Sequence, residues 1–237
     1  MRIADRDIRR LLLAPFALRH WRALRGIVRT FDDPRAALIR YLTNGGQYPW
    51  LPTVRTPLGP IQVILADRHD LLTVNEIFCR QDYGASRNRT VVDIGANVGF
   101  ATLFFLTRSP ETRVWAFEPD PENIVRLRKT LSGFEDRYTL FAAAVTADDL
   151  SRVRFVTAGR YGHIAGVGEP ATEVPAVSIA RALRGVSDEA GPIDLVKIDT
   201  EGTESELLAG IPPDVLIKEI RYEDGAGRVV SVRRRPA

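Results

Sequence analysis

The feature that most constrains this sequence is a short apolar run that contains one acid and is followed at once by a glycine-rich turn. Residues 90–94 read as a buried strand, the turn runs from Gly95 to Gly99, and an apolar helix is predicted over residues 100–107. Open α/β sheets begin with this strand–turn–helix order, and they bind ligands beyond the carboxyl ends of their strands. A glycine turn lets the backbone approach a ligand, and the helix N-terminus offers N–H groups to it.

The same alternation continues along the chain. Asp120 followed by Pro121 is typical of a helix N-cap with proline at the first helical position. After the first strand we expect strands over residues 113–118, 138–145, 193–198 and 215–222, the last of them paired with a strand over 228–232. We also expect a helix over residues 204–209. Strands and helices that alternate at this spacing predict an α/β fold with a doubly wound, mostly parallel, Rossmann-like sheet.

The first 59 residues have a different character. Apolar residues recur at helical intervals over residues 3–31 with Arg between them, which predicts one or two amphipathic helices broken near Pro15. Residues 44–60 are rich in Gly and Pro and read as a linker. We therefore expect an Arg-rich helical extension with its linker over residues 1–59 and the α/β domain over 60–237. Asp70 is the N-cap that we expect for a helix over residues 70–80.

The charge is divided unevenly along the chain. The formal net charge is only +3, but residues 1–40 hold ten Arg against four acids, so the body of the protein is acidic. This uneven charge does not by itself indicate nucleic-acid binding, which needs a basic stripe on a folded face, and we expect no nucleic-acid partner. For the basic helices two alternatives stay open: contact of residues 1–40 with an anionic membrane surface, or packing on the main domain. The lone Cys79 excludes an internal disulfide and favours a cytoplasmic setting.

An acid follows the second predicted strand. Glu118 lies 23 residues after Gly95, where a carboxylate can accept hydrogen bonds from both hydroxyls of a ribose. A dinucleotide fingerprint would need glycines at positions 95, 97 and 100, and this chain has Asn97 and Phe100 at the last two. A nicotinamide dinucleotide is therefore disfavoured, although it stays an alternative.

Two more acids follow the strand predicted over residues 193–198. Asp199 and Glu201 reach the same edge of the sheet as the glycine turn, where they could deprotonate a hydroxyl, hold a divalent cation or orient a substrate. His163, in a glycine-flanked segment, is a further candidate base, with a hydrogen-bonding spacer as its alternative role. With three His and one Cys in the chain, a metal site would need carboxylates, and we predict none.

Taken together, these segments resemble the FkbM-type methyltransferases, a branch of the class I S-adenosylmethionine-dependent enzymes. Three blocks carry the resemblance: VVDIGANVGFATLFFL (91–106), VWAFEPDPENIVRLRKTL (114–131) and DLVKIDTEGTESELLAG (194–210). The family's third block usually reads KIDVEG, so Thr200 departs from it but leaves both acids in place. The resemblance implies S-adenosyl-L-methionine as cofactor. The residues that it assigns to the cofactor are Asp93, Gly95, Asn97 and Gly99 at the methionine end, Glu118 at the ribose and Ala143, within 142–144, at the adenine.

The resemblance also implies the reaction. Members of the family are similar to enzymes that methylate hydroxyls of sugars, oligosaccharides or glycolipids, and of polyketides or other small metabolites. A non-catalytic cofactor-binding module is the third alternative. For the base that accepts the hydroxyl proton, the candidates in order are Asp199, Glu201 and His163.

Overall fold

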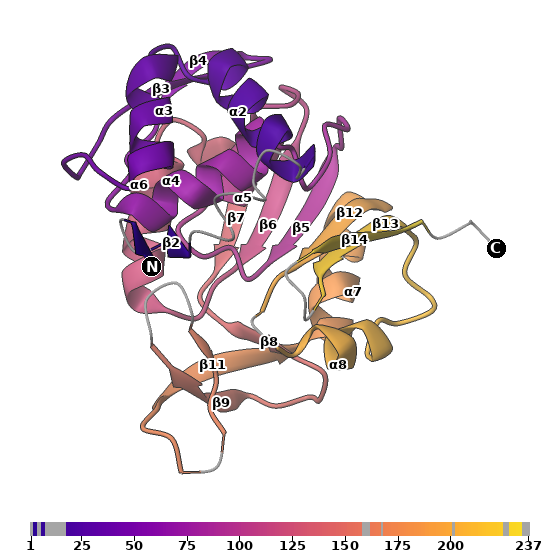
Figure 1. The fold of residues 1–237 in the computed structure, drawn as a ribbon. Helices are drawn as coiled ribbons and strands as arrows, with labels where there is room; N and C mark the ends of the chain where they lie inside the picture. The colour runs from indigo at the N-terminus through magenta and orange to yellow at the C-terminus, as the bar shows by residue number, and fades with distance from the viewer. Residues whose placement is uncertain are drawn as a thin grey trace. The chain divides into compact units, whose positions relative to one another are not determined.

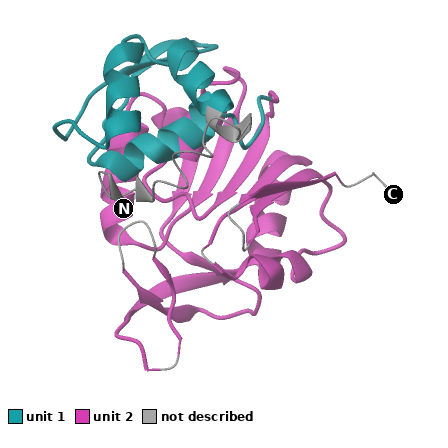
Figure 2. Ribbon diagram, viewed as in Figure 1, with its two compact units in different colours: residues 1–85 teal, residues 86–237 magenta. Residues whose placement is uncertain are grey.

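The computed structural model describes residues 2–3, 6–7, 18–157, 162–166, 168–200, 202–224 and 228–233. It divides into two compact units, residues 1–85 and residues 86–237 (Figure 2). The division that we expected between residues 59 and 60 falls inside a hairpin of the first unit, formed by β3 (Thr53–Thr56) and β4 (Gly59–Gln62). Because β4 is hydrogen-bonded to β3, the residues that follow the Gly/Pro-rich segment stay with the first unit.

The first unit is mainly helical. Its other elements are β1 (Arg2–Ile3), β2 (Arg6–Asp7), α2 (Leu18–Thr30), α3 (Pro34–Thr43), α4 (Arg68–Val74) and the π-helical turn η2 (Asn75–Cys79). Of the segment predicted to be helical over residues 3–31, residues 4–5 and 8–17 lie outside the described residues. The predicted helix is confirmed by α2, but the prediction is wrong at residues 3 and 6–7, which lie in β1 and β2. The N-cap predicted at Asp70 is wrong, because Asp67 caps α4 by accepting the N–H groups of His69 and Asp70. Asp70 instead accepts the Ala66 N–H at 2.6 Å.

The second unit is built on a six-stranded sheet with the order β14-β13-β12-β5-β6-β7 (Figure 1). Its strands are β5 (Thr90–Ile94), β6 (Arg113–Phe117), β7 (Tyr138–Phe141), β12 (Ile193–Ile198), β13 (Ile217–Glu223) and β14 (Val229–Arg233). All neighbours are parallel except β14, which runs antiparallel to β13. The predicted doubly wound, mostly parallel sheet is confirmed. Its order reverses between β5 and β12, which is where such sheets bind ligands.

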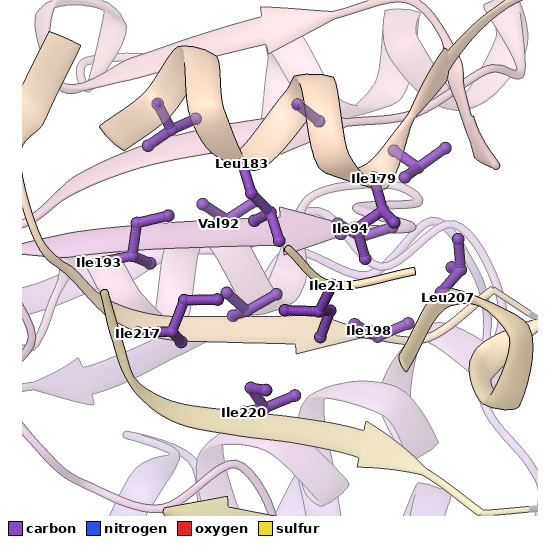
Figure 3. Packing of buried hydrophobic residues seen from close by; sticks show 14 of the residues in the cluster. Val92, Ile94, Ile179, Leu183, Ile193, Ile198, Leu207, Ile211, Ile217 and Ile220 are labelled. Carbon is purple, nitrogen blue, oxygen red and sulfur yellow. The ribbon is translucent and has the colours of Figure 1, made fainter. Parts of the chain in front are cut away.

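Helices cover both faces of this sheet. On one face, α7 (Ile179–Ala190) packs on β5, with Leu183 over Val92 and Ile179 beside Ile94 (Figure 3). The same apolar cluster also takes in Ile198 of β12 and Leu207 of α8 (Glu204–Ala209). Side chains alternate along a strand, so the residues between these face the other side. That side carries α5 (Phe100–Leu106), all of whose residues are buried. The next helix, α6 (Pro121–Thr130), follows β6 in the chain.

A second, four-stranded sheet has the order β10-β9-β11-β8 and was not predicted. Its strands are β8 (Ala144–Thr146), β9 (Arg152–Val156), β10 (His163–Ile164) and β11 (Thr172–Ser178). The single strand predicted over residues 138–145 is wrong. The chain turns after Phe141, whose carbonyl accepts the Ala143 N–H, so β7 stays in the large sheet while β8 pairs with β11 in the small one. No helix within the described ranges is long and apolar enough to span a membrane.

Candidate functional site

The glycine turn after β5 is held tightly against the end of β12. Gly95 has φ +76°, and a Cβ atom placed on it would lie 1.9 Å from the carbonyl oxygen of Asp199. Only glycine fits such an approach. The N–H groups of Gly95 and Ala96 both donate to the carbonyl of Phe117 at the end of β6. The turn therefore ties together the ends of three neighbouring strands.

Glu118 is buried beside this turn, with 4% of its surface exposed. Its Oε2 accepts the backbone N–H of Asn97 at 2.7 Å, and its Oε1 accepts the N–H of Asp120 at 3.0 Å and the side-chain amide of Asn123 at 3.3 Å. Burial raises the pKa of Glu118, although these hydrogen bonds act against the shift. The carboxylate thus has a fixed position at the end of β6.

Beneath the turn lies a buried ion pair. Lys197 and Asp93 are register partners on β12 and β5, and the Lys197 Nζ lies 3.0 Å from Asp93 Oδ1. Asp93 has no exposed surface, and its Oδ2 accepts the hydroxyl of Thr102 on α5 at 2.6 Å. The Lys197 Nζ also donates to the Gly95 carbonyl at 2.7 Å. The acid in the first strand therefore supports the turn from below.

Asp199 begins the loop that follows β12. Its backbone N–H donates to the Ile94 carbonyl, and its Oδ2 lies 3.6 Å from Lys197 Nζ. The rest of the loop is organised by Glu204, whose carboxylate accepts the N–H groups of Thr200 and Gly202. Asp199 retains 30% side-chain exposure, in contrast to the buried Asp93.

These elements surround a pocket that is open to solvent and encloses about 600 Å³ of empty space, part of it solvent. It is lined by two groups of residues. The large sheet and its loops contribute Ile94, Gly95, Asn97, Glu118, Pro119, Asn123, Asp199, Thr200 and Thr203. The small sheet contributes Ala144, Val145, Phe155, Gly162 and Ile164. The pocket is therefore polar on one side and apolar on the other, and it lies at the switch point of the large sheet.

The structure brings four of the predicted site residues onto the pocket lining: Gly95, Asn97, Glu118 and Asp199. The other predicted cofactor residues lie elsewhere. Asp93 lies below the turn, and Gly99 faces α6, where an added Cβ would be 3.0 Å from the Leu127 side chain. Ala143 is not on the lining, whereas the next residue, Ala144, is. The sequence pattern located this segment but not which of its alanines faces the pocket.

His163 and Glu201 are the other two candidate bases. His163 is flanked by Gly162 and Ile164, both on the pocket lining, so alternation along β10 turns its side chain the other way. Its Nε2 lies 3.3 Å from Glu169 Oε2. Glu201 lies outside the described residues.

Asn123 and Phe155 are two of the lining residues that sequence reasoning missed. Asn123 reaches Glu118 from the first turn of α6, and its place three residues after the N-cap Asp120 was the available signal. Phe155 comes from β9, whose short apolar alternation between charged residues was too weak to predict a strand.

A comparison with models of protein families shows which family this chain belongs to. Residues 93–232 match the model described as the methyltransferase FkbM domain. The chain belongs to this family. The match includes the glycine turn, Glu118, the small sheet, most of the large sheet and the loop at Asp199, so every lining residue of the pocket lies inside the FkbM domain.

Two curated relatives share part of the FkbM domain. The 2-O-methyltransferase NoeI of Sinorhizobium fredii is 30% identical over 138 residues, which cover 51% of this chain and 56% of NoeI. The AMB antimetabolite synthetase AmbE of Pseudomonas aeruginosa is 26% identical over 123 residues, which cover 52% of this chain and 6% of AmbE. The chain thus spans about half of NoeI and a small part of AmbE.

Among solved structures, a methyltransferase from Geobacter sulfurreducens is 20% identical to this chain, with a TM-score of 0.34. The alignment covers 57% of this chain and 53% of that one.

Proposed function

We propose that the protein is an S-adenosylmethionine-dependent O-methyltransferase that acts on a hydroxyl of a sugar, oligosaccharide or glycolipid. Membership of the FkbM family supports methyl transfer. The similarity to NoeI, which is named as a 2-O-methyltransferase, supports a hydroxyl acceptor. The observation that carries the proposal is the buried Glu118 carboxylate, which the Asn97 N–H of the glycine turn fixes on the lining of the pocket.

The residues present suit this cofactor. A carboxylate offers about four lone-pair sites, and the hydrogen bonds described for Glu118 use three of them, so it can accept at least one ribose hydroxyl. The absence of a side chain at Gly95 lets the turn pack directly against the Asp199 backbone at the end of β12, and Gly95 itself lines the pocket. Asn97 and Phe100, in place of the glycines of a dinucleotide fingerprint, disfavour a nicotinamide cofactor.

When bound, S-adenosylmethionine supplies a methyl group made electrophilic by the positive charge on its sulfur. The protein's task is to bring the acceptor oxygen into line with that group and to keep water away, and such alignment lowers the barrier by several kcal/mol. The apolar side of the pocket, with Phe155 and Ile164, supports the exclusion of water.

The acceptor hydroxyl must also lose its proton. Asp199 is the leading candidate to accept it at a carboxylate oxygen, because it lines the pocket and retains partial exposure. Glu201 stays the second candidate on the sequence argument. His163 is the third, and its contact with Glu169 makes the role of a hydrogen-bonding spacer the better supported one.

The experiment that tests the proposal offers S-adenosylmethionine together with two panels of acceptors, one of carbohydrates and glycolipids and one of polyketides and other small metabolites. Mass spectrometry then detects the addition of one methyl group. We expect products only in the carbohydrate panel. Products confined to the metabolite panel would establish the second candidate, which the similarity to AmbE, named as an antimetabolite synthetase, favours. No product in either panel, with cofactor binding intact, would indicate a binding module without catalysis.

We also infer that α2 contacts an anionic membrane surface. The described part of this helix exposes Arg22, Arg25 and Arg29 beside the exposed apolar residues Trp21 and Val28. Basic and aromatic residues on one helix face favour such contact. Co-sedimentation with anionic liposomes tests this, and we expect replacement of the three Arg residues by Gln to reduce binding. If the wild type and the variant bound the liposomes equally, α2 would have only a packing role.

A further inference from the structure

We propose that Lys197 is a positioning residue of the cofactor site, an inference that rests on the proposed function. Its ammonium group fixes the glycine turn from below and keeps the acids of the site in place. Lys197 was part of a sequence block, but the mechanism above gives it no role.

The first argument is the burial of a charged side chain at a place where the sheet does not require one. Lys197 is 2% exposed and lies within β12, between the buried apolar residues Val196 and Ile198. An unpaired ammonium group in such surroundings is costly, and an apolar side chain would avoid that cost. A buried lysine therefore has to be explained by what its Nζ contacts.

The second argument is the set of contacts that the Nζ makes. It donates to the Gly95 carbonyl at 2.7 Å, and it lies 3.0 Å from Asp93 Oδ1 and 3.6 Å from Asp199 Oδ2. These partners belong to the end of β5, the turn and the loop after β12. One ammonium group thus links three segments that border the pocket.

The third argument is the path from Lys197 to Glu118. The peptide between residues 95 and 96 is held at both ends: its carbonyl, on Gly95, accepts from Lys197, and its N–H, on Ala96, donates to the Phe117 carbonyl. Two residues further on, the Asn97 N–H donates to Glu118 Oε2 at 2.7 Å. A change in the Gly95 peptide therefore displaces the donor that orients the ribose-binding carboxylate.

The charges agree with this geometry. Burial by itself lowers the pKa of Lys197, but the carboxylates of Asp93, Asp199 and, further away, Glu118 outweigh it and hold this pKa above its usual range. The surrounding carboxylates therefore favour the charged form of Lys197. The three acids and one lysine leave a net negative site, which suits a cofactor with a positive sulfur.

The test compares Lys197→Met with the wild type by isothermal titration with S-adenosylhomocysteine and by thermal unfolding, at three pH values between about 6 and 9. We expect the variant to bind the ligand about 10-fold more weakly or worse, as is typical when a residue that orients a binding group is lost. Without the ammonium group, the buried Asp93 favours its protonated form. The variant's Tm, relative to wild type, therefore falls further as the pH rises.

Two controls separate positioning from mere support of the fold. Val196→Ala removes buried apolar contacts from the same strand, and we expect it to lower Tm equally at every pH with unchanged affinity. Lys218→Met removes the exposed lysine whose Nζ lies 2.6 Å from Asp194 Oδ1, and we expect little change in either measurement.

A double variant, Lys197→Met with Asp93→Asn, keeps the test available if the single variant fails to fold. It removes both buried charges, so we expect its Tm to lose the added pH dependence while its affinity stays low, because the Gly95 carbonyl still lacks its donor. Wild-type affinity in the double variant, or a pH-independent loss in Lys197→Met like that of Val196→Ala, would overturn the inference. If the wild type itself fails to bind S-adenosylhomocysteine, the proposed function fails, whereas the pH dependence of Tm still tests the charge pairing.

Discussion

The two sides of the pocket are built differently. On the side of the large sheet, polar groups are buried and fixed by several partners each, as Glu118 is by three N–H groups and Asp93 by Lys197 and Thr102. On the side of the small sheet, the lining is apolar, and the cluster behind it has three buried members, Ala144, Phe155 and Val174. Preorganised polar groups suit one invariant ligand, whereas a small apolar wall can vary without loss of the main core. This contrast is our reason to assign the methionine and ribose of the cofactor to the first side, with the adenine reaching Ala144 of β8, and selection of the acceptor to the rest of the second side.

The largest effect that we expect is that of Gly95→Ala, on the cofactor side. The new Cβ would meet the Asp199 carbonyl at 1.9 Å in a backbone conformation that already disfavours alanine. We expect a loss of roughly 4 kcal/mol in the free energy of unfolding and no measurable binding of S-adenosylhomocysteine. The matched control is Gly133→Ala, where φ is +87° and no atom lies within 4 Å of the added Cβ. It should cost only about 1–2 kcal/mol and leave binding unchanged. Equal losses in the two variants, measured by denaturant unfolding, would show that the contact with Asp199 is unimportant.

The next effect is that of Asp199→Asn on turnover. The amide keeps the size of the side chain but cannot accept a proton, so we expect turnover to fall by about 10²–10⁴-fold while cofactor affinity changes little. Steady-state kinetics with an acceptor found in the panels, combined with calorimetry, measure both. Unchanged turnover would remove Asp199 as the base and direct the same test to Glu201.

Glu118→Gln should weaken binding of S-adenosylhomocysteine by about 10- to 100-fold, because a hydrogen bond to a charged group is replaced by one to a neutral group. Burial raises the pKa of Glu118, and only its ionised form accepts hydrogen bonds with both oxygens. Wild-type affinity should therefore begin to fall, on acidification, at a higher pH than an ordinary glutamate would give, and Glu118→Gln should lack that decline. Glu122→Gln, on the exposed first turn of α6, is the control and should bind as the wild type does.

The smallest effect is expected on the small-sheet side, from Phe155→Leu. Leucine fills most of the space, so stability should change by only about 1 kcal/mol. The KM for the acceptor should rise several-fold with unchanged affinity for S-adenosylhomocysteine, whereas Val153→Ala, in the same cluster but off the lining, should leave both unchanged. A loss of cofactor affinity in Phe155→Leu would mean that the small sheet belongs to the cofactor side as well.

The same contrast explains what the sequence could predict. The large sheet was predictable because each buried run ends at polar or glycine residues, and strand ends of a parallel sheet meet at one edge. Glu118 could be placed by its distance from Gly95 for that reason. The ion pair beneath the turn could not be predicted, because the pairing of Lys197 with Asp93 depends on the register of two strands that lie more than 100 residues apart in the chain.

The small sheet was missed for physical reasons that can be named. Between Phe141 and Ala144 no glycine or proline marks the turn, so two strands looked like one. A shift of one residue reverses the face of a strand, and sequence alone could not choose Ala144 over Ala143 or turn His163 away from the pocket. The N-cap of α4 could have been either Asp67 or Asp70, because both aspartates precede apolar residues of the predicted helix and the sequence pattern does not distinguish them. In the structure Asp67 is the cap.

The central claim is that the glycine turn and Glu118 form the site for S-adenosylmethionine. It is tested most directly by calorimetric titration of the whole chain with S-adenosylhomocysteine and, separately, with NAD. We expect saturable binding of one S-adenosylhomocysteine per chain and no heat of binding with NAD. Binding of NAD without binding of S-adenosylhomocysteine would contradict the assignment.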